Sequence, residues 1–247
     1  MKILNPTALS EAPSCVLLDL DNTLYEYDPA HAAGMDAVRE YAEQQLRISS
    51  ADFDDCFRAA RAEIKQRLGP TGSSHHRLLY FQRTLEKAGL ATQPMSALQM
   101  EQVYWSAFLS KAALFDDVLE FMDDLRIAGI PAIIVTDLTA QIQLRKLLYF
   151  NLHKYVDWMV TSEESGADKP AVGIFHLALA KIGGVEGTVW MIGDDPAKDI
   201  AGARDALGCT TFQKVLELDK YILQDSATPD AIFARFGDLR EKLSDLI

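Results

Sequence analysis

The stretch VLLDLDNTLYEY, residues 16–27, decides the fold of this 247-residue chain. Residues 15–18 are all apolar, a pattern typical of a strand that is buried on both faces of a parallel sheet. An Asn-Thr pair, which favours a turn, follows Asp19 and Asp21, so both carboxylates should lie where the strand ends. Open α/β sheets bind ligands at that end of their strands. Two acids there cost desolvation energy unless a positive group lies between them; the alternative is an ordinary strand end with solvated turn residues.

The acidic composition narrows the classes of partner. The formal net charge is −12 and the isoelectric point is about 4.8, without any run of Lys and Arg, so we expect no nucleic-acid partner. A small anionic substrate would need a local cluster of positive groups or a metal ion. We expect a monomer or a homodimer, and the sequence does not separate the two.

The cysteines and the hydropathy indicate a cytoplasmic protein. The three cysteines are widely spaced and odd in number, which fits neither a disulfide framework nor a metal pattern and favours a reducing compartment. The sequence shows no signal-like segment and no apolar stretch long enough to span a membrane, so we expect no membrane partner. The first dozen residues, with Pro6 and Pro13, look like a loose leader.

Two kinds of pattern divide the chain. From about residue 28 to residue 114, apolar residues recur at helical spacing, which predicts roughly four helices with a loop at residues 69–76. From about residue 115 onward strands and helices alternate, which indicates parallel βαβ units. The first strand must join that sheet because it has no other partner. The expected fold class is therefore α/β, a parallel sheet with an inserted helical bundle, and the tail after residue 218 should add an edge strand and a closing helix.

Polar residues of chemical interest follow four of the predicted strands. Because the carboxyl ends of parallel strands lie along one edge of a sheet, these residues can converge on one site. One such ending is commonplace, but four compatible endings in order are hard to explain as turn chemistry. The residues are Asp19 and Asp21; Thr136 and Asp137; Asp168, Lys169 and Pro170; and Asp194 and Asp195, followed by Asp199.

The order D-x-D-x-T, a strand-ending Thr, Lys-Pro and G-D-D-x-x-x-D resembles the haloacid dehalogenase (HAD) superfamily over about the whole chain. The first and fourth motifs are specific, whereas the second and third are weak alone. The resemblance implies a Rossmannoid three-layer catalytic core at residues 1–24 and 115–247, with a helical cap of the C1 type inserted at residues 25–114. The segments TLY and TSEESGADKP are similar to those of nucleotidases and sugar-phosphate phosphatases.

The resemblance implies a Mg²⁺-dependent phosphomonoester hydrolase that acts on a small phosphorylated metabolite, a nucleotide or a sugar phosphate, through an aspartyl-phosphate. Asp19 is then the nucleophile, and a plain metal ligand is its alternative role. Asp21 protonates the leaving group and later accepts a proton from the attacking water. The Mg²⁺ ion is held by the side chains of Asp19 and Asp194 and by the backbone carbonyl of Asp21.

The resemblance also gives roles to the residues around the phosphoryl group. Thr136, the catalytic Lys169 and the backbone amides at Asn22 and Asp137 hold its oxygens as charge shifts. The second motif departs from the family pattern, in which a small or amide residue, often Asn, and then Gly follow the Thr. Here Asp137 and Leu138 stand there, and an acid beside the phosphate should weaken binding unless it points away or pairs with a cation.

The third and fourth motifs leave alternatives open. By resemblance Asp199 orients Lys169 or a metal-bound water, and Asp195 shares that role or faces solvent. Lys169 taken alone can be an ordinary surface lysine that precedes a proline. Asp194 and Asp195 can cap the following helix, which is compatible with metal binding.

The loop GPTGSSHHRLLYF is the part of the helical insertion that we expect to select the substrate. His75, His76 and Arg77 gather positive or hydrogen-bonding groups in an otherwise acidic chain, and Arg can grip a second phosphate or a carboxylate with two hydrogen bonds. We predict that at least one of the three contacts the leaving group. The alternative is that they cap or decorate the next helix.

Other activities on the same fold compete with phosphate hydrolysis. A 2-haloacid dehalogenase needs the nucleophile but neither a metal nor an acid two residues later, so Asp21 argues against it. A phosphomutase works through the same aspartyl-phosphate, and the sequence separates it poorly. A catalytically weak scaffold with a binding or regulatory role is the remaining class; the presence of Asp19 and Asp194 argues against it, and the unusual Asp137 keeps it open.

Overall fold

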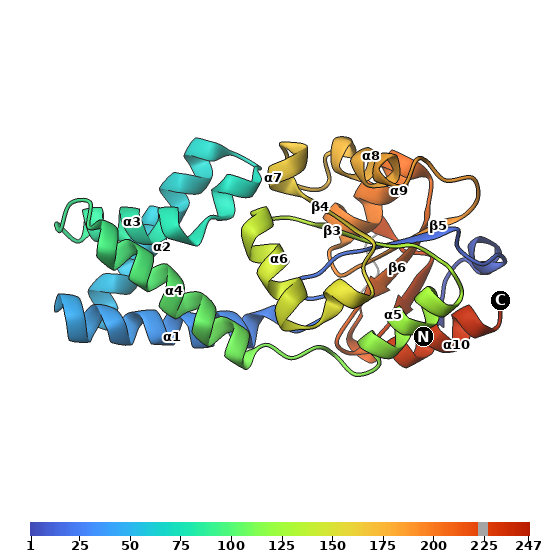
Figure 1. Cartoon of the computed structure of the whole chain (residues 1–247), viewed down its shortest axis with the longest axis horizontal. Helices are drawn as coiled ribbons and strands as arrows, with labels where there is room; N and C mark the ends of the chain where they lie inside the picture. Colours follow the sequence, from blue (N-terminus) through green and yellow to red (C-terminus); the bar gives the residue numbers. More distant parts are fainter. Residues whose placement is uncertain (222–226) are drawn as a thin grey trace. The chain divides into compact units, whose positions relative to one another are not determined.

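The computed structural model describes residues 1–221 and 227–247, and the chain divides into two compact units. Unit 1 consists of Met1–Glu26 and Ala113–Ile247, and unit 2 is the single segment Tyr27–Ala112. Unit 1 carries the sheet, whereas unit 2 is helical (Figure 1). No helix in the described ranges is both long and apolar enough to cross a membrane.

Unit 1 is built on a seven-stranded sheet in the order β1-β7-β6-β5-β2-β3-β4. Among the described strands all neighbours pair in parallel except β1, which pairs antiparallel with β7. Strand β2, which precedes the first motif, lies between β5 and β3 in the centre. The expected α/β class with a mostly parallel sheet is confirmed. The strands are β1 (Lys2–Ile3), β2 (Cys15–Leu18), β3 (Ala132–Thr136), β4 (Trp158–Thr161), β5 (Val189–Gly193), β6 (Thr210–Lys214) and β7 (Ala231–Phe233).

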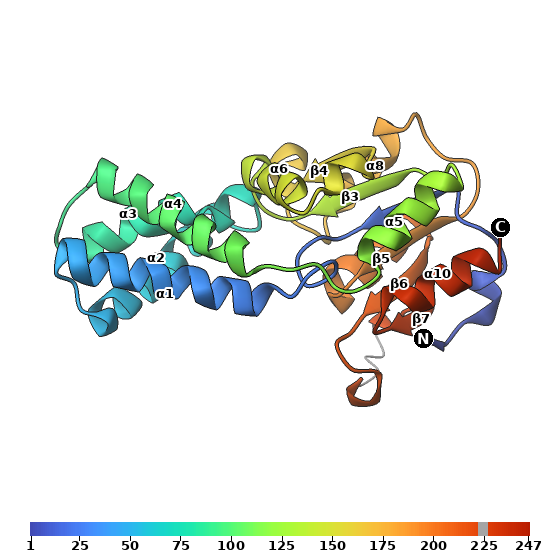
Figure 2. The same ribbon diagram turned by 60° about the horizontal axis from the view of Figure 1, so that its bottom comes forward.

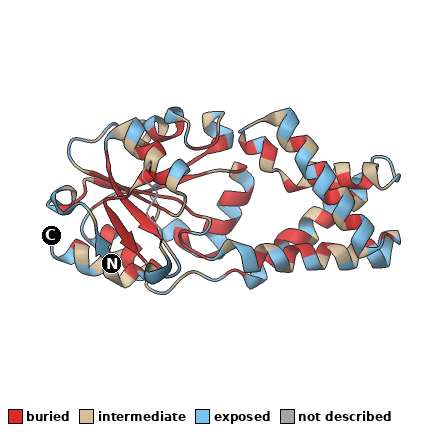
Figure 3. Ribbon diagram, turned by 180° about the vertical axis from the view of Figure 1, so that it is seen from behind, coloured by how far each residue is buried: buried red, intermediate tan, exposed pale blue. Residues whose placement is uncertain are grey.

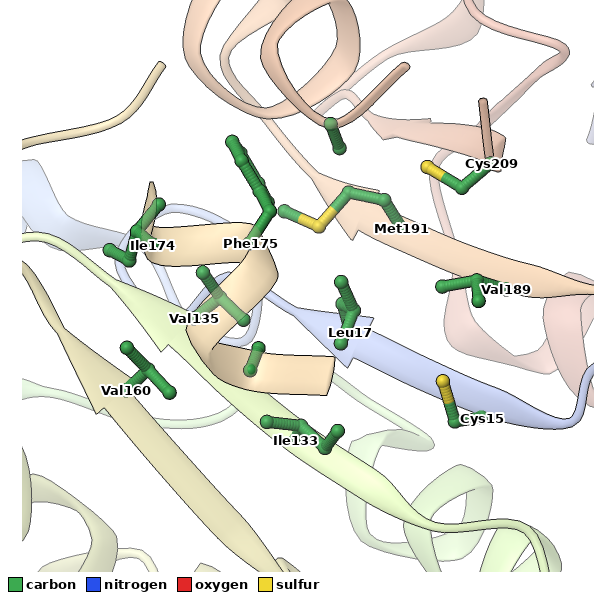
Figure 4. Close-up of a cluster of buried hydrophobic side chains, with 12 residues drawn as sticks. Cys15, Leu17, Ile133, Val135, Val160, Ile174, Phe175, Val189, Met191 and Cys209 are labelled. Carbon is green, nitrogen blue, oxygen red and sulfur yellow. The ribbon is translucent and has the colours of Figure 1, made fainter. Parts of the chain in front are cut away.

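Helices cover both faces of this sheet (Figures 1 and 2). Side chains alternate between the faces of a strand, so Leu17 points to one face and its neighbours to the other. Figure 4 shows Leu17, Ile133 and Met191 gathered around Phe175 of α8, and α9 extends the same cluster. Helices α5 and α10 lie on the opposite face. The helices of unit 1 are α5 (Val118–Ile127), α6 (Ala140–Tyr149), α7 (Ser162–Ser165), α8 (Val172–Lys181), α9 (Gly202–Leu207) and α10 (Phe236–Ser244).

The expectation of a loose leader is wrong for the first nine residues. Strand β1 adds to the outer side of β7, and residues Pro6–Leu9 form a 3-10 turn. The amino group of Met1 donates to a carboxylate oxygen of Asp238 in α10 at 2.8 Å. The predicted tail strand and closing helix exist as β7 and α10, but β7 is not an edge strand because β1 covers it.

The chain leaves unit 1 and returns to it at one place. Tyr25 and Leu114 form an antiparallel bridge, although 88 residues separate them in sequence. The backbone N–H of Phe115 donates to the carbonyl of Leu24 at 2.9 Å beside that bridge. The two connecting segments are therefore paired before the helical insertion begins.

Unit 2 is an antiparallel set of helices whose inner faces are buried (Figure 3). Helix α2 begins at an N-cap, where the Ser49 hydroxyl accepts from the N–H of Asp52 at 3.2 Å, and it ends at Gly69, which has a positive φ of 63°. The predicted loop at residues 69–76 contains a short 3-10 turn, η2 (Gly72–His75). The helices are α1 (Tyr27–Leu46), α2 (Ser50–Leu68), α3 (Arg77–Lys87) and α4 (Pro94–Lys111).

Candidate active site

Asp19, which follows β2, lies against Lys169 from the segment after α7. The ammonium of Lys169 donates to Asp19 Oδ1 and to Asp199 Oδ1, both at 2.6 Å, and to the carbonyl of Val135 at 3.0 Å. Lys169 is 4% exposed, so it is not an ordinary surface lysine. Burial works against its charge, but the carboxylates of Asp19, Asp199 and Asp137 outweigh burial and raise the pKa of Lys169.

The second oxygen of Asp19 is also held. Thr23, the last residue of the first motif, donates its hydroxyl hydrogen to Asp19 Oδ2 at 2.8 Å. Burial raises the pKa of Asp19 well above its ordinary value, and the nearby Asp199 and Asp194 add to this effect while Lys169 opposes it. The carboxylate therefore has a fixed orientation, and a further positive charge beside it would relieve the repulsion.

Three carboxylates can share such a positive charge. Asp19, Asp194 and Asp199 each offer one oxygen, and these oxygens lie within 4.8 Å of one another. Burial raises the pKa of Asp194 to about 7, and the charges of Asp199 and Asp195 contribute. An all-oxygen donor set of this kind fits a hard divalent cation such as Mg²⁺. The side chain of Asp21 is not in this triad, whereas Asp199, expected to act through Lys169 or a water, is in the triad and also bonds Lys169.

The π-helical turn η4 (Pro196–Ala201) after β5 places Asp199. Asp199 Oδ2 accepts from the backbone N–H of Asp195 at 3.0 Å. Asp195 Oδ1 in turn accepts from the N–H groups of Ala197 and Lys198 at 2.9 and 3.0 Å. Asp195 therefore caps the turn, which was one of the alternatives for this residue.

The carboxylate of Asp21 is bound by two residues that the motifs did not indicate. The ammonium of Lys146, in α6, donates to both oxygens of Asp21 at 2.6 and 2.8 Å, and the hydroxyl of Tyr25 donates to Oδ1. Lys146 is completely buried. The one sequence signal is its spacing: it lies four residues after Ile142 and three after Gln143, on the helix face that points inward.

Thr136 ends β3 beside the same edge of the sheet and is 1% exposed. Its hydroxyl oxygen accepts from Gln143 Nε2 at 2.6 Å, and the same amide group donates to the carbonyl of Asp137 at 2.8 Å. Gln143 is fully buried and, like Lys146, lies outside the four motifs. It fixes both the predicted phosphate-binding hydroxyl and the turn that follows.

The unusual Asp137 of the second motif is paired with a cation. Its Oδ2 accepts from the ammonium of Lys198 at 2.8 Å, and its Oδ1 accepts from the backbone N–H of Lys169 at 2.9 Å. Asp137 therefore ties the second motif to the third and the fourth. Leu138, which replaces the usual Gly, has a φ of 100°, in the left-handed region that disfavours residues with a side chain. Asn22 in the first motif has a φ of 65°, which Asn tolerates better.

His75, His76 and Arg77, the residues predicted to contact the leaving group, lie in unit 2. His75 and His76 are half-buried, and Arg77 is 8% exposed. The guanidinium of Arg77 donates to the carbonyl of His75 at 2.9 Å and to the hydroxyl of Tyr27, and it lies 5.4 Å from the centre of the Tyr104 ring. Arg77 is thus engaged inside unit 2. The predicted contact of these residues with a leaving group stays a prediction.

Lys214, at the end of β6, is another buried cation that no motif indicated. It is 3% exposed, and within the described ranges no carboxylate lies at ion-pair distance from it. Its ammonium donates to the carbonyl of Val215 at 2.9 Å and lies 4.1 Å from the centre of the Phe115 ring. Burial lowers the pKa of Lys214 to about 8, although Asp194 and Glu26 act in the opposite direction.

Comparisons with known proteins show the family to which the chain belongs. The family model for haloacid dehalogenase-like hydrolases matches residues 13–206. The chain is 38% identical over 237 residues to the ribulose-1,5-bisphosphate 5-phosphatase of Halopiger xanaduensis, with 95% of this chain and 99% of that protein covered. It is 29% identical over 192 residues to the glyceraldehyde 3-phosphate phosphatase of Methanopyrus kandleri, with 77% and 79% covered.

Solved structures show the same fold at lower identity. A 2-haloacid dehalogenase from Pseudomonas syringae pv. Tomato superposes with a TM-score of 0.72 at 20% identity. The match covers 95% of this chain and 100% of the dehalogenase. A HAD phosphatase from Thermococcus onnurineus gives a TM-score of 0.66 at 22% identity, covering 93% and 97%. The chain belongs to the haloacid dehalogenase-like hydrolases, as the motifs predicted. It is a hydrolase and, like these relatives, a phosphatase.

Proposed function

We propose that this enzyme is a Mg²⁺-dependent phosphomonoester hydrolase that acts on a small sugar phosphate through a phosphorylated Asp19. One observation carries the proposal: the Asp19 carboxylate is oriented by Thr23 and Lys169 and lies beside the carboxylates of Asp194 and Asp199. The relatives named as ribulose-bisphosphate and glyceraldehyde-phosphate phosphatases support a sugar phosphate over the nucleotide that the sequence left open.

The proposed reaction has two halves. In the first, an oxygen of Asp19 attacks phosphorus, the bond to the leaving oxygen breaks, and Asp21 gives that oxygen a proton. In the second, water attacks the phosphorus of the aspartyl-phosphate and Asp21 takes the proton of the water. Mg²⁺, held by Asp19, Asp194 and the backbone carbonyl of Asp21, would supply the positive charge that lets a carboxylate approach a phosphate. This second half releases inorganic phosphate and regenerates the free carboxylate of Asp19.

The phosphoryl oxygens have donors among the residues of the sheet edge. The Lys169 ammonium already bonds Asp19, so it lies close to the point of attack. We assign the Thr136 hydroxyl and the backbone amides at Asn22 and Asp137 to the remaining oxygens. Lys198 neutralises the Asp137 carboxylate, which removes the main objection to an acid at this position.

The two units have different proposed roles. Unit 1 is the catalytic core, because it holds every residue of the four motifs. Unit 2 is the cap that reads the rest of the substrate, with His75, His76 and Arg77 as candidates for this contact. The enzyme is proposed to work in the cytoplasm as a monomer or homodimer, and its free cysteines support a reducing compartment.

The test is a panel of phosphorylated metabolites assayed for released phosphate with Mg²⁺ and with EDTA. The panel should include ribulose 1,5-bisphosphate, glyceraldehyde 3-phosphate, phosphoserine, a nucleoside monophosphate and 4-nitrophenyl phosphate. We expect release from at least one sugar phosphate in Mg²⁺ and none in EDTA. The Asp19→Asn variant keeps the shape of the side chain and serves as the matched control, with expected turnover at least about a thousandfold lower.

Each competing activity gives a different result in the same panel. A phosphomutase would return an isomeric sugar phosphate with little free phosphate. A dehalogenase would release halide from a 2-haloacid without added metal. A binding scaffold would show no turnover of any substrate, and activity that survives in EDTA or in Asp19→Asn would contradict the proposed mechanism.

A further inference from the structure

The carboxylate of Asp21 is held from inside the protein. The ammonium of Lys146 contacts both of its oxygens, at 2.6 and 2.8 Å, and the side chain of Lys146 has no exposed surface. The Asp21 side chain is 24% exposed, so the reactive group lies at the surface of unit 1 while its anchor lies in the interior. A buried ammonium is costly unless it is well paired, which ties Lys146 to Asp21.

Tyr25 completes the arrangement around Asp21. Its hydroxyl donates to Oδ1, and its ring lies 5.7 Å from the Lys146 ammonium and 5.1 Å from the ring of Phe150. Oδ1 therefore accepts from both Lys146 and Tyr25, whereas Lys146 is the donor to Oδ2 among the residues that the structure describes. Oδ2 keeps the larger free acceptor capacity and is the oxygen through which a proton can be exchanged.

We infer that Lys146 is a positioning residue for proton transfer, which holds the Asp21 carboxylate in one orientation and leaves Oδ2 available to the leaving group. This inference rests on the proposed function. Asp21 Oδ2 delivers its proton to the leaving oxygen as the phosphorus–oxygen bond breaks, and it takes a proton from water in the second half of the reaction. Lys146 supplies orientation.

The competing explanation is that the ion pair only fastens α6 to the loop of the first motif. Loss of a purely structural pair would lower stability and would affect every substrate by a similar factor. Loss of a positioning contact instead depends on the leaving group. An alkyl phosphate needs a proton on its leaving oxygen, whereas 4-nitrophenyl phosphate releases a stable anion and needs little help.

The experiment measures kcat and KM of the Mg²⁺-loaded full chain on two substrates, the best alkyl phosphate of the panel and 4-nitrophenyl phosphate. For Lys146→Met we expect kcat on the alkyl phosphate to fall about tenfold to hundredfold further than kcat on the aryl phosphate. Tyr25→Phe, which keeps the buried ring and removes one bond to Oδ1, should show the same pattern more weakly. Lys146→Arg, which can also contact both oxygens, should recover part of the alkyl activity.

A double-variant cycle separates positioning from general damage. In the Asp21→Asn background, Lys146→Met should have almost no further effect on the alkyl phosphate, because the group it positions has already lost its acid function. Lys181→Met is the matched control. Lys181, at the end of α8, pairs with Glu164 at 2.8 Å outside the Asp21 cluster. Its replacement should leave kcat on both substrates unchanged.

The outcomes are distinct. Equal losses on both substrates in Lys146→Met and Tyr25→Phe, or additive losses in the double variant, would overturn the inference while the proposed function stands. If Lys146→Met does not fold, Tyr25→Phe alone and in the Asp21→Asn background decides the question. A parent enzyme that hydrolyses no phosphate ester would overturn the proposed function and the inference together.

Discussion

Gly193 and Asp199 approach each other so closely that a methyl group on Gly193 would overlap the carboxyl group of Asp199. Gly193 is the last residue of β5, and Asp199 follows one short turn later. Asp199 in turn bonds the ammonium of Lys169. The absence of a side chain at Gly193 is thus a condition for the position of the Lys169 ammonium.

We therefore predict that Gly193→Ala displaces Asp199 and lowers kcat/KM about a hundredfold, which is the effect expected when a charged group near the reacting atoms moves by about an ångström. The measurement is steady-state hydrolysis beside a thermal melt. Gly173→Ala is the control, because its new methyl group meets open space in α8, and the added helix propensity should stabilise the fold by about 0.5–1 kcal/mol. Normal activity in Gly193→Ala would mean that Asp199 is not needed in its present place.

The second prediction concerns Asp194 and pH. Its folded-state pKa of about 7 exceeds the ordinary 3.8, so between these values the folded protein holds a proton that the unfolded chain has released. In EDTA the free energy of unfolding should fall as pH rises from about 4 to about 7. The Asp194→Asn variant should lose that part of the slope and be more stable than the parent at pH 7.

Added Mg²⁺ should reverse this trend, because the ion needs the deprotonated carboxylate. We expect the Mg²⁺-induced rise in Tm to be larger at pH 8 than at pH 6 in the parent and to be nearly absent in Asp194→Asn. Urea titrations and thermal melts at four or five pH values measure both effects. A pH-independent Mg²⁺ shift would contradict the assignment of Asp194 as a metal ligand.

The third prediction tests the pair between Asp137 and Lys198. Lys198 is partly exposed, so Lys198→Ala should cost only about 0.5–1 kcal/mol of folding free energy. Asp137→Ala should cost about 2 kcal/mol or more, because it also leaves the backbone N–H of Lys169 without its acceptor. The double variant should match Asp137→Ala closely. Urea unfolding measures the cycle, and equal costs for the two single variants would contradict the argument.

The fourth prediction concerns Lys214. Its folded-state pKa of about 8 lies below the ordinary 10.5, so the folded protein is penalised for its charge below pH 8, and the penalty fades as pH rises to about 10.5. Lys214→Met should therefore raise the free energy of unfolding by about 1–3 kcal/mol at pH 7, with a smaller gain at pH 9.5. Urea unfolding at both pH values checks this. A loss of stability at pH 7 would show that the charge is better compensated than the contacts indicate.

The fifth prediction concerns substrate selection by the cap loop. His75→Ala and His76→Ala should each be compared with the parent on the best sugar phosphate and on 4-nitrophenyl phosphate. A residue that contacts the leaving group should lose about tenfold to hundredfold in kcat/KM on the sugar phosphate alone, equivalent to about 1.5–3 kcal/mol. Arg77→Ala should instead lower the Tm and affect both substrates, because Arg77 is buried in unit 2. Parent-like behaviour of both histidine variants would place substrate selection elsewhere.

The part of the site that could be predicted lies at strand ends. Asp19, Thr136 and Asp194 each lie at the end of a short apolar run, and the geometry of a parallel sheet brings such ends to one edge. Lys169 lies further from its strand, after α7, and was indicated by its place before Pro170 in the order of the motifs. Local sequence is enough for this inference, because the strands are recognised by composition and their direction follows from the intervening helices. The fold class and the helical insertion were predicted for the same reason.

The part that could not be predicted lies on helices and at chain ends. No motif contains Lys146 or marks Lys198 as a partner of Asp137, and only the packing of α6 and η4 brings these lysines to Asp21 and Asp137. Asp199 lies beside Asp19 and Asp194 because of a π-helical turn, which has no simple sequence signal. Strand β1 is two residues long, too short for alternation to be visible.

The bridge between Tyr25 and Leu114 bears on the exchange of the helical insertion between relatives. Because the two ends of the insertion are already paired, a turn of a few residues in place of the helices would close the chain and leave the sheet of unit 1 intact. On the proposed roles of the two units, a gene segment exchanged at this point would change what is recognised and would leave the residues proposed to react unaltered. The paired backbones at residues 25 and 114 are therefore a natural junction for chimeras, in which exchange of unit 2 between relatives would test whether this unit carries their specificity.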